Sequence, residues 1–396
     1  MRLWQKASGA IKDRKSIWTA KLMHNGPYQN PIFEAVVIKA TSHDEHCIDC
    51  KNVQRVFQWL RTSPLHLKPL LFALSFRMDK TKNWVVAIKG LMLMHGVFCT
   101  NIPAVQKMGR LPFDFSNFSD GYLHPSKAWG YNSFVRAYFA YLDQRSGFVS
   151  SEFKRLSMKK NHKNKKDVSE VDETLMEELN KLHKFQALID SLVHIKPRNE
   201  SMKENGLILE AMDCVIVEIF DVYSKFCKIM ANVLMRIYDV GGRDEAAMAL
   251  KVLQKASSQG EDLSSYFQFC KVIGVLNASQ CPRIERISDE DIQDLERIIS
   301  GDMENKVFEE NSNMAIVVRD ISMEMEKGLK TVITEQWEVF DDVVCAKDYS
   351  SWEIVAATAN NNPFLDSSFD LSLVCQHHLP PPRVAYNQVL PDLISF

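Results

Sequence analysis

The sequence predicts an all-α fold, a helical solenoid followed by a largely irregular C-terminal tail. Apolar residues recur at three- and four-residue intervals through about the first 280 residues, which is the spacing of a buried helix face. Glycine and proline are few, at 15 and 14 of 396 residues, and no segment shows strand-like alternation. Short loops between such segments favour antiparallel helices that pack mainly on their neighbours.

The chain divides into four parts on these criteria. Residues 1–20 predict an amphipathic N-terminal helix, and residues 21–282 predict the solenoid, with a basic linker over residues 150–170. Residues 283–340 are interpreted as an acidic helical extension, and residues 341–396 as an unstructured tail that carries short peptide motifs.

The N-terminal helix carries an apolar stripe flanked by lysines. The stripe contains Leu3, Trp4, Ile11 and Trp18. A helix of this kind can insert into the headgroup layer of a membrane, with tryptophan at the interface and lysines reaching anionic lipid. It can equally be the first helix of the solenoid, docked on the others. Both interpretations stay open at this point.

Apolar periodicity predicts the helices of the solenoid in order. The segments are 33–39, 51–60, 67–78, 84–99, 126–149, 171–195, 207–238, 246–257 and 263–276. In the extension, residues 287–300 are acidic and residues 314–333 are a candidate exposed helix. Pro125 opens one of them and Pro197 follows another, as helix starts and stops require. The aromatic residues of segment 126–149 follow helical spacing without interleaved Arg and Lys, so we expect core packing rather than stacking on nucleic-acid bases.

The densest basic run, KRLSMKKNHKNKK, covers residues 154–166 and lacks apolar periodicity after Met158. A mobile solvated linker is the first interpretation. Contact with a membrane surface is the second, and nuclear import or nucleic-acid contact the third. No nucleic-acid-binding fold accompanies the run, so no nucleic-acid partner is expected.

Charge is distributed unevenly along a chain whose net charge is only −2. Residues 1–170 hold 27 Lys and Arg against 12 Asp and Glu, whereas the remainder holds 21 against 38. A basic front half and an acidic back half favour a surface for an anionic partner and a tail held away from it.

A corner between the predicted helices 33–39 and 51–60 is the candidate binding site. Lys39 ends the first helix and Lys51 opens the second, so one lysine lies on each side of the loop. The N–H groups that open a helix favour an anion, and two ammonium groups can close around it. A phosphate is therefore the expected guest.

The corner also resembles that of a known family. Lys39-Ala-Thr-Ser-His-Asp-Glu, followed by Lys51, is similar to the phosphoinositide-binding corner of ANTH domains, the N-terminal modules of clathrin-assembly adaptors, with the plant branch the closer match. The family pattern at the corner is a lysine, nine residues, a basic residue, any residue, a second basic residue, and His or Tyr. Asp49 and Asn52 stand where the pattern has lysine and His or Tyr.

The resemblance covers about the first 280 residues and implies a right-handed ANTH-like solenoid. Asp13-Arg14-Lys15-Ser16, Trp84-Val-Val-Ala-Ile-Lys89 and Arg110-Leu-Pro-Phe-Asp114 belong to it as well. It also implies headgroup contacts from Lys39, His43 and Lys51, with phosphatidylinositol 4,5-bisphosphate as the expected lipid.

Two motifs in the tail favour weak, multivalent capture of coat proteins. Asn362-Pro363-Phe364 resembles the peptide bound by EH domains of endocytic scaffolds, in which Asn and Pro form a turn that presents Phe. Asp392-Leu393-Ile394 resembles the Asp-Leu-Leu type of clathrin and adaptor peptide.

Metal and enzyme chemistry find little support. His43, His46, Cys47 and Cys50 lie within eight residues, whereas a structural zinc site usually takes its second ligand pair from another segment, so no metal and no other cofactor are expected. The phosphate loop, dinucleotide fingerprint, HExxH motif and nucleophile elbow are all missing from the sequence, which favours a non-enzyme.

The sequence therefore predicts a clathrin-coat adaptor on phosphoinositide membrane, with clathrin and EH-domain scaffolds as partners. The absence of a secretory signal or a membrane-spanning segment predicts a cytoplasmic, peripheral membrane protein of clathrin-coated pits and vesicles, with the Golgi as a further site. The alternative is a cytosolic helical scaffold that binds a partner helix, such as a SNARE, and has lost lipid recognition. Asp49 and Asn52 favour this alternative.

Overall fold

The computed structural model describes residues 2–22, 30–163, 174–281 and 289–300, with Ile284 and Ile287 between the last two ranges. These residues form α-helices and two short 3₁₀ helices, and no strand occurs among them. In chain order the elements are α1 (Arg2–Leu22), α2 (Pro31–Ala40), α3 (Cys50–Thr62), η1 (Pro64–His66), α4 (Leu67–Lys80), α5 (Trp84–Cys99), α6 (Pro103–Gln106), α7 (Pro125–Lys163), α8 (Leu175–Val193), α9 (Glu200–Lys203), α10 (Gly206–Val240), α11 (Arg243–Val272), η2 (Leu276–Gln280) and α12 (Asp289–Ser300).

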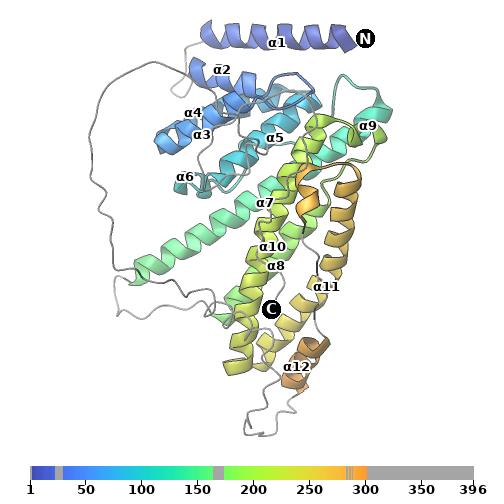
Figure 1. The fold of residues 1–396 in the computed structure, drawn as a ribbon. Coiled ribbons are helices and arrows are strands. Elements are labelled where there is room, and N and C mark those ends of the chain that lie inside the picture. The colour runs from blue at the N-terminus through green and yellow to red at the C-terminus, as the bar shows by residue number, and fades with distance from the viewer. Residues whose placement is uncertain are drawn as a thin grey trace, which may run out of the picture.

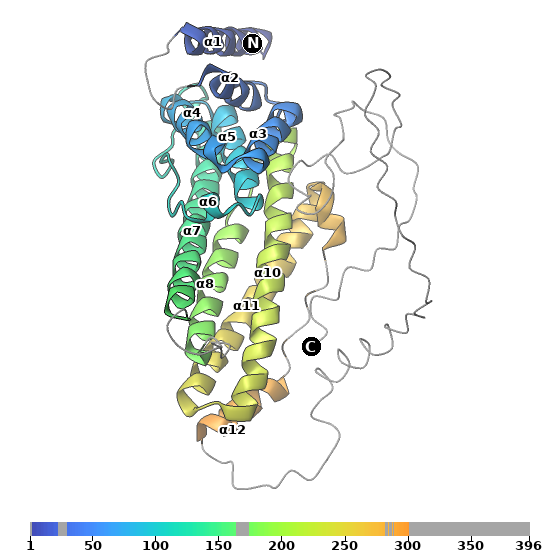
Figure 2. The same cartoon turned by 90° about the vertical axis from the view of Figure 1, so that its left-hand side faces the viewer.

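The helices form two regions of one helical solenoid. Helices α1 to α6 are stacked at one end and are called here the short-helix region (Figure 1). Helices α7, α8, α10 and α11, the long-helix region, run side by side away from it (Figures 1 and 2). Helix α1 lies across α2 at the outer end of this stack, and α12 packs on α11 at the opposite end. One continuous core joins both regions. The all-α solenoid expected from the sequence is confirmed.

Helix α5 is the central helix of the short-helix region, because every residue from Trp84 to Phe98 is buried. The Asn83 side chain caps it by accepting hydrogen bonds from the N–H groups of Val85 and Val86. The polar residues Lys89 and His95 are buried with it, at 0% and 2% exposure. A buried polar group needs partners, so each of them marks a place where α5 is tied to another part of the chain, Lys89 to Ser42 and His95 to Tyr138 and Glu218.

The aromatic residues of α7 pack in the core as the helical spacing predicts. Tyr131, Phe134, Tyr138 and Tyr141 are all buried. Trp129 is the exception, with 58% of its surface exposed and the guanidinium of Arg198 5.8 Å from its ring centroid.

The basic linker predicted over residues 150–170 is wrong for its first part, because α7 continues to Lys163. The reason lies in the first turn of α8. The Glu177 carboxylate forms ion pairs with Nζ of Lys159, at 2.5 Å, and with a guanidinium nitrogen of Arg155, at 3.5 Å. Arg155 also pairs with Glu152. These carboxylates offset the charge of a strongly basic run, and one of them, Glu177, comes from the next helix.

The two helices predicted over 246–257 and 263–276 are one helix, α11. The Gln259 side chain, expected at the break, is buried and donates to the backbone oxygen of Gln186 at 2.8 Å. Gly260 allows Ile284 to come close, since a Cβ at this position would lie 3.2 Å from the Ile284 methyl group. Packing against α8 and Ile284 therefore favours helix through a polar stretch that looks like a loop.

The packed region extends past the predicted boundary at residue 282. Leu295 of α12 is fully buried, and Ile298 and Ile299 pack against the same core. Among the described helices none combines the length and apolar character needed to span a bilayer. The predicted helix 314–333 and both tail motifs lie outside the described residues.

Candidate functional site

The corner predicted from the sequence is the loop of residues 41–49, between α2 and α3. Lys39 lies in the last turn of α2 and Lys51 in the first turn of α3, and both side chains are exposed. The structure therefore places the two lysines near the ends of one short loop, with both side chains in solvent.

The two residues that depart from the family pattern contact each other. Asp49 is the N-cap of α3, and its Oδ1 accepts the N–H of Asn52 at 3.1 Å. The Asn52 side chain donates to Asp49 Oδ2 at 2.6 Å. The chain's own carboxylate therefore occupies the helix N-terminus that the sequence assigns to a phosphate.

His43 is held by α1. Its ring Nδ1 lies 2.8 Å from Oδ1 of Asp13, and its backbone N–H donates to Oδ2 of the same carboxylate at 2.9 Å. Arg77 of α4 completes the group, with Nη2 2.8 Å from Asp13 Oδ1. Burial favours a higher pKa for Asp13, but the hydrogen bonds from His43 and the charge of Arg77 lower it below its ordinary value.

Ionisable side chains from two further helices form hydrogen bonds with the loop. Lys89 of α5 donates from Nζ to the Ser42 hydroxyl at 3.2 Å, and burial lowers the pKa of this lysine. Glu210 of α10 accepts the backbone N–H of Ile48 at 3.1 Å. Burial raises the pKa of Glu210 to about 7. The loop is thus held by groups from α1, α4, α5 and α10 that are distant from it in the sequence.

Helix α1 is docked and still presents an apolar side outwards. Gly9, Asp13 and Ala20 lie on the side that faces the corner. Ile11 and Trp18, on the opposite side, are 66% and 65% exposed. The other predicted membrane residues, Leu3 and Trp4, belong to α1, but their side chains lie outside the described residues. Docking and an exposed apolar side are therefore compatible in this helix.

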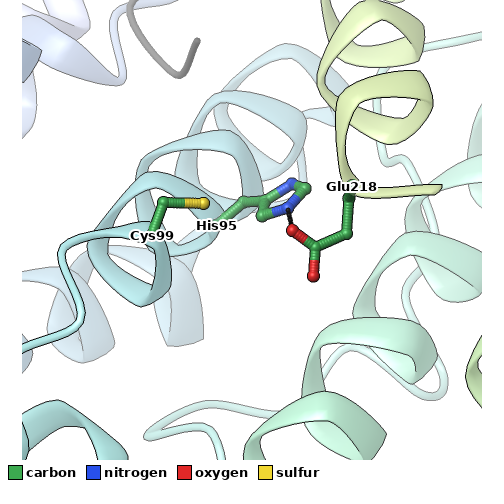
Figure 3. A group of neighbouring side chains, drawn as sticks. All are labelled: His95, Cys99 and Glu218. Carbon is green, nitrogen blue, oxygen red and sulfur yellow. Dashed lines mark hydrogen bonds and ion pairs between the residues drawn. The ribbon is translucent and has the colours of Figure 1, made fainter. Parts of the chain in front are cut away.

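The His and Cys residues of the corner do not gather around a shared point in the described structure. A different group does, formed by His95, Cys99 and Glu218, whose ligand atoms lie within 4.8 Å of one another. Figure 3 shows His95 and Cys99 projecting from α5 toward Glu218 of α10.

The chemistry of this group favours a structural role over metal binding. Glu218 already binds Arg145, the hydroxyl of Tyr141 at 2.5 Å and the ring of His95 at 3.1 Å. A cation would have to enter beside the Arg145 guanidinium, which the same carboxylate holds. Burial and the Glu218 charge also raise the pKa of Cys99 to about 12, so this residue is a neutral thiol beside Glu218.

Sequence reasoning missed the residues that fix the corner. The shared feature of Asp13, Arg77, Lys89 and Glu210 is that each reaches the loop from another helix. Two of them left a signal, because Lys89 interrupts an otherwise apolar segment and Asp13 belongs to a stretch that resembles the family. Arg77 and Glu210 have nothing unusual in their neighbourhoods.

Comparisons with known proteins agree with this architecture. The model of the ANTH domain matches residues 32–301. An Arabidopsis thaliana protein named "Putative clathrin assembly protein" is 42% identical over the full length of both chains. A second protein of that name and organism is 41% identical over 86% of this chain and 88% of its own.

A more distant relative from Arabidopsis thaliana, "Clathrin coat assembly protein AP180", is 27% identical over 74% of this chain and 49% of its own length. The family match begins after α1 and ends one residue beyond α12, so it covers the packed solenoid from α2 onwards. The all-α fold and these comparisons together show that this chain belongs to the ANTH-domain family of clathrin assembly proteins.

Proposed function

We propose that this protein is a clathrin-coat adaptor that binds phosphoinositide membrane through the α2–α3 corner and recruits coat proteins through its tail. The observation that carries the proposal is the pair of exposed lysines, Lys39 and Lys51, on the two sides of a nine-residue loop in an ANTH domain. Ammonium groups at this spacing suit a polyphosphorylated headgroup such as that of phosphatidylinositol 4,5-bisphosphate.

The exposed side of α1 supports contact with the bilayer itself. Ile11 and Trp18 are each about two-thirds exposed, and lysines flank them. Each exposed apolar side chain that enters the interface contributes at about 25 cal/mol per Å² buried. In this proposal the protein is peripheral, with the corner reading the headgroup and α1 adding apolar contact.

Liposome co-sedimentation tests the corner. Lys39→Glu with Lys51→Glu should abolish binding to vesicles that contain phosphatidylinositol 4,5-bisphosphate. The matched control is Lys228→Glu with Lys251→Glu, which makes the same charge change at exposed positions of α10 and α11. A corner variant that sediments like the parent would refute the corner as the lipid site.

A second pair of variants tests α1. Ile11→Ser with Trp18→Ser should weaken vesicle binding without lowering the melting temperature, because both side chains are exposed. Trp129→Ser removes an exposed tryptophan from α7 and should leave vesicle binding unchanged. Equal losses for both variants would contradict a specific role for α1.

The tail motifs give the recruitment half of the proposal. A three-residue peptide offers one good anchor, so a dissociation constant weaker than about 10 μM is expected for each motif alone. Phe364→Ala should remove EH-domain capture, whereas Leu393→Ala should reduce clathrin or adaptor capture and spare the EH domain. If the unaltered full chain retains neither partner from cell extract, the recruitment proposal fails.

A second candidate function is favoured by the contact between Asp49 and Asn52. This pair fills the N-terminus of α3 with a carboxylate, which weakens the corner for phosphate and leaves a helical scaffold that binds a partner helix, such as a SNARE. Asp49→Lys with Asn52→His should then create lipid binding where the parent has none. If the parent already binds vesicles through Lys39 and Lys51, the scaffold alternative is excluded.

A further inference from the structure

Helix α1 and the corner meet at one residue, His43. The Asp13 carboxylate binds both its backbone N–H and its ring Nδ1, at 2.9 and 2.8 Å. Arg77 donates to the same carboxylate at 2.8 Å. Two N–H donors from the loop and one guanidinium therefore surround a single anionic group, as they would surround a phosphate oxygen.

The anion that fills this group is part of the chain. The side chains of Asp13, His43 and Arg77 are only 14%, 16% and 11% exposed. Arg77 is held in place from the other side by the hydroxyl and backbone oxygen of Thr41, at 2.6 and 2.7 Å. The cationic and N–H donor groups are thus already in place and partly enclosed, and α1 supplies the carboxylate that they bind.

Gly9 makes the contact between α1 and His43 rigid. It lies one turn before Asp13 on the same side of α1, and a Cβ at this position would come within 2.7 Å of His43 Cβ. The helix backbone therefore lies directly against His43. If His43 turned toward another ligand, it would lose its hydrogen bonds to Asp13 and would clash with the backbone of Gly9.

We propose that the Asp13 carboxylate is an internal occupant of the anion-binding groups at the corner, and that an incoming headgroup phosphate displaces it and releases α1. This inference rests on the proposed function, because it takes the corner as the headgroup site. Headgroup capture and docking of α1 then oppose each other, and by linkage whatever loosens α1 raises the affinity for a soluble headgroup by the same factor. The released helix is free to lie in the membrane interface.

Hydrogen exchange of the full chain with inositol 1,4,5-trisphosphate tests the release. Saturating ligand should speed exchange of the amides of residues 11–20 at least fivefold, a coupling at the low end of those known. The same ligand should have no effect on Lys39→Glu with Lys51→Glu. Unchanged or slower exchange in α1 of the parent, with the ligand bound, overturns the inference and leaves the proposed function standing.

Binding of the trisphosphate to two variants tests the competition. Asp13→Asn should raise the affinity about fivefold or more, beyond the gain from Asp44→Asn, which removes an exposed charge from the same loop. Gly9→Ala loosens α1 without changing any charge and should raise the affinity as well. An Asp13→Asn gain no larger than that of Asp44→Asn, or a loosened α1 in Gly9→Ala without a gain, refutes the displacement. Failure of the parent and all variants to bind the trisphosphate or the vesicles refutes both proposals.

Discussion

Glu218 illustrates how much one buried side chain can hold together. It joins α10 to α5 through His95 and to α7 through Tyr141 and Arg145. Burial opposes its charge, but Arg145 and His95 reverse this effect and lower the pKa of Glu218 well below its ordinary value. A buried carboxylate with three partners is a structural tie rather than a reactive group.

Glu218→Gln should therefore destabilise the fold by about 3–5 kcal/mol, because the Arg145 charge would remain buried without a counter-charge. Chemical denaturation followed by circular dichroism measures the loss. Asp221→Asn is the control, since this exposed carboxylate lies three residues further along the same helix and should change stability by less than about 0.5 kcal/mol. Added zinc should leave the melting temperature of the parent unchanged; a zinc-dependent rise would show that the group binds metal after all.

Glu210 has the opposite electrostatic behaviour. Burial raises its pKa from an ordinary value of 4.5 to about 7, so the folded protein holds a proton that the unfolded chain gives up. Its contribution is fully present below pH 4.5 and is lost as the pH rises through about 7. Protonation at this position is thus linked to the loop that Glu210 supports through Ile48.

Glu210→Gln should remove part of the pH dependence of stability. In the parent, the free energy of unfolding should fall between pH 4.5 and about 7 by at most about 1.4 kcal/mol per pH unit from this group. Denaturation curves at several pH values measure the slope in the parent and the variant. An equal slope in both proteins would mean that Glu210 does not titrate in this range.

Helix α7 shows how an element is completed by its neighbour. Its last turns carry a basic run that would repel itself in an isolated helix. Carboxylates of α7 and α8 offset this repulsion, with Glu177 in contact with both Arg155 and Lys159. These ion pairs stabilise as helix a segment that the sequence pattern predicts to be a linker.

Glu177→Lys should loosen the end of α7 while the global fold stays intact. Because Glu177 is 38% exposed, its ion pairs act in solvent and we expect a local effect. Hydrogen exchange should become faster for the amides of residues 155–159, with little change in melting temperature. Glu204→Lys, at an exposed position beside α9, is the control and should leave these amides unchanged. Faster exchange throughout the long-helix region would show that Glu177 stabilises more than the end of α7.

At the scale of the whole molecule, one core runs from the short helices to α12. Leu295 closes this core at its far end and is completely buried, with Ile298 and Ile299 beside it. The residues that form the corner lie at the opposite end (Figure 1). The solenoid thus separates the proposed membrane-binding surface from the end of α12 at Ser300.

A chain that ends at residue 300 should unfold in one cooperative transition close to that of the full chain. A chain that ends at residue 280 loses α12 and should melt on the order of 5–10 °C lower, because burial of Leu295 and its neighbours is lost. Differential scanning calorimetry compares the three proteins. Equal melting temperatures for the two truncated chains would mean that the packed solenoid ends at residue 282, as the sequence predicts.

Local chemistry determined the fold class and most helix boundaries. Pro125 marks a helix start, Asn83 is of a residue type that favours the N-cap, and the sequence predicts α5 with the bounds that the structure shows. The exposed positions of Lys39 and Lys51 follow equally from the helices on which they lie. These features depend on a few neighbouring residues, so the sequence alone could specify them.

Only the tertiary structure decided what surrounds the corner. Asp13 is 30 residues from His43 and 64 from Arg77, and no pattern in the sequence indicates that they meet. The same holds for Glu210, which lies 162 residues from Ile48. Helix periodicity reports which side of a helix is buried but not which helix covers it. Ionic contacts between distant helices are therefore invisible in the sequence, and in this protein such contacts hold α1 against the corner.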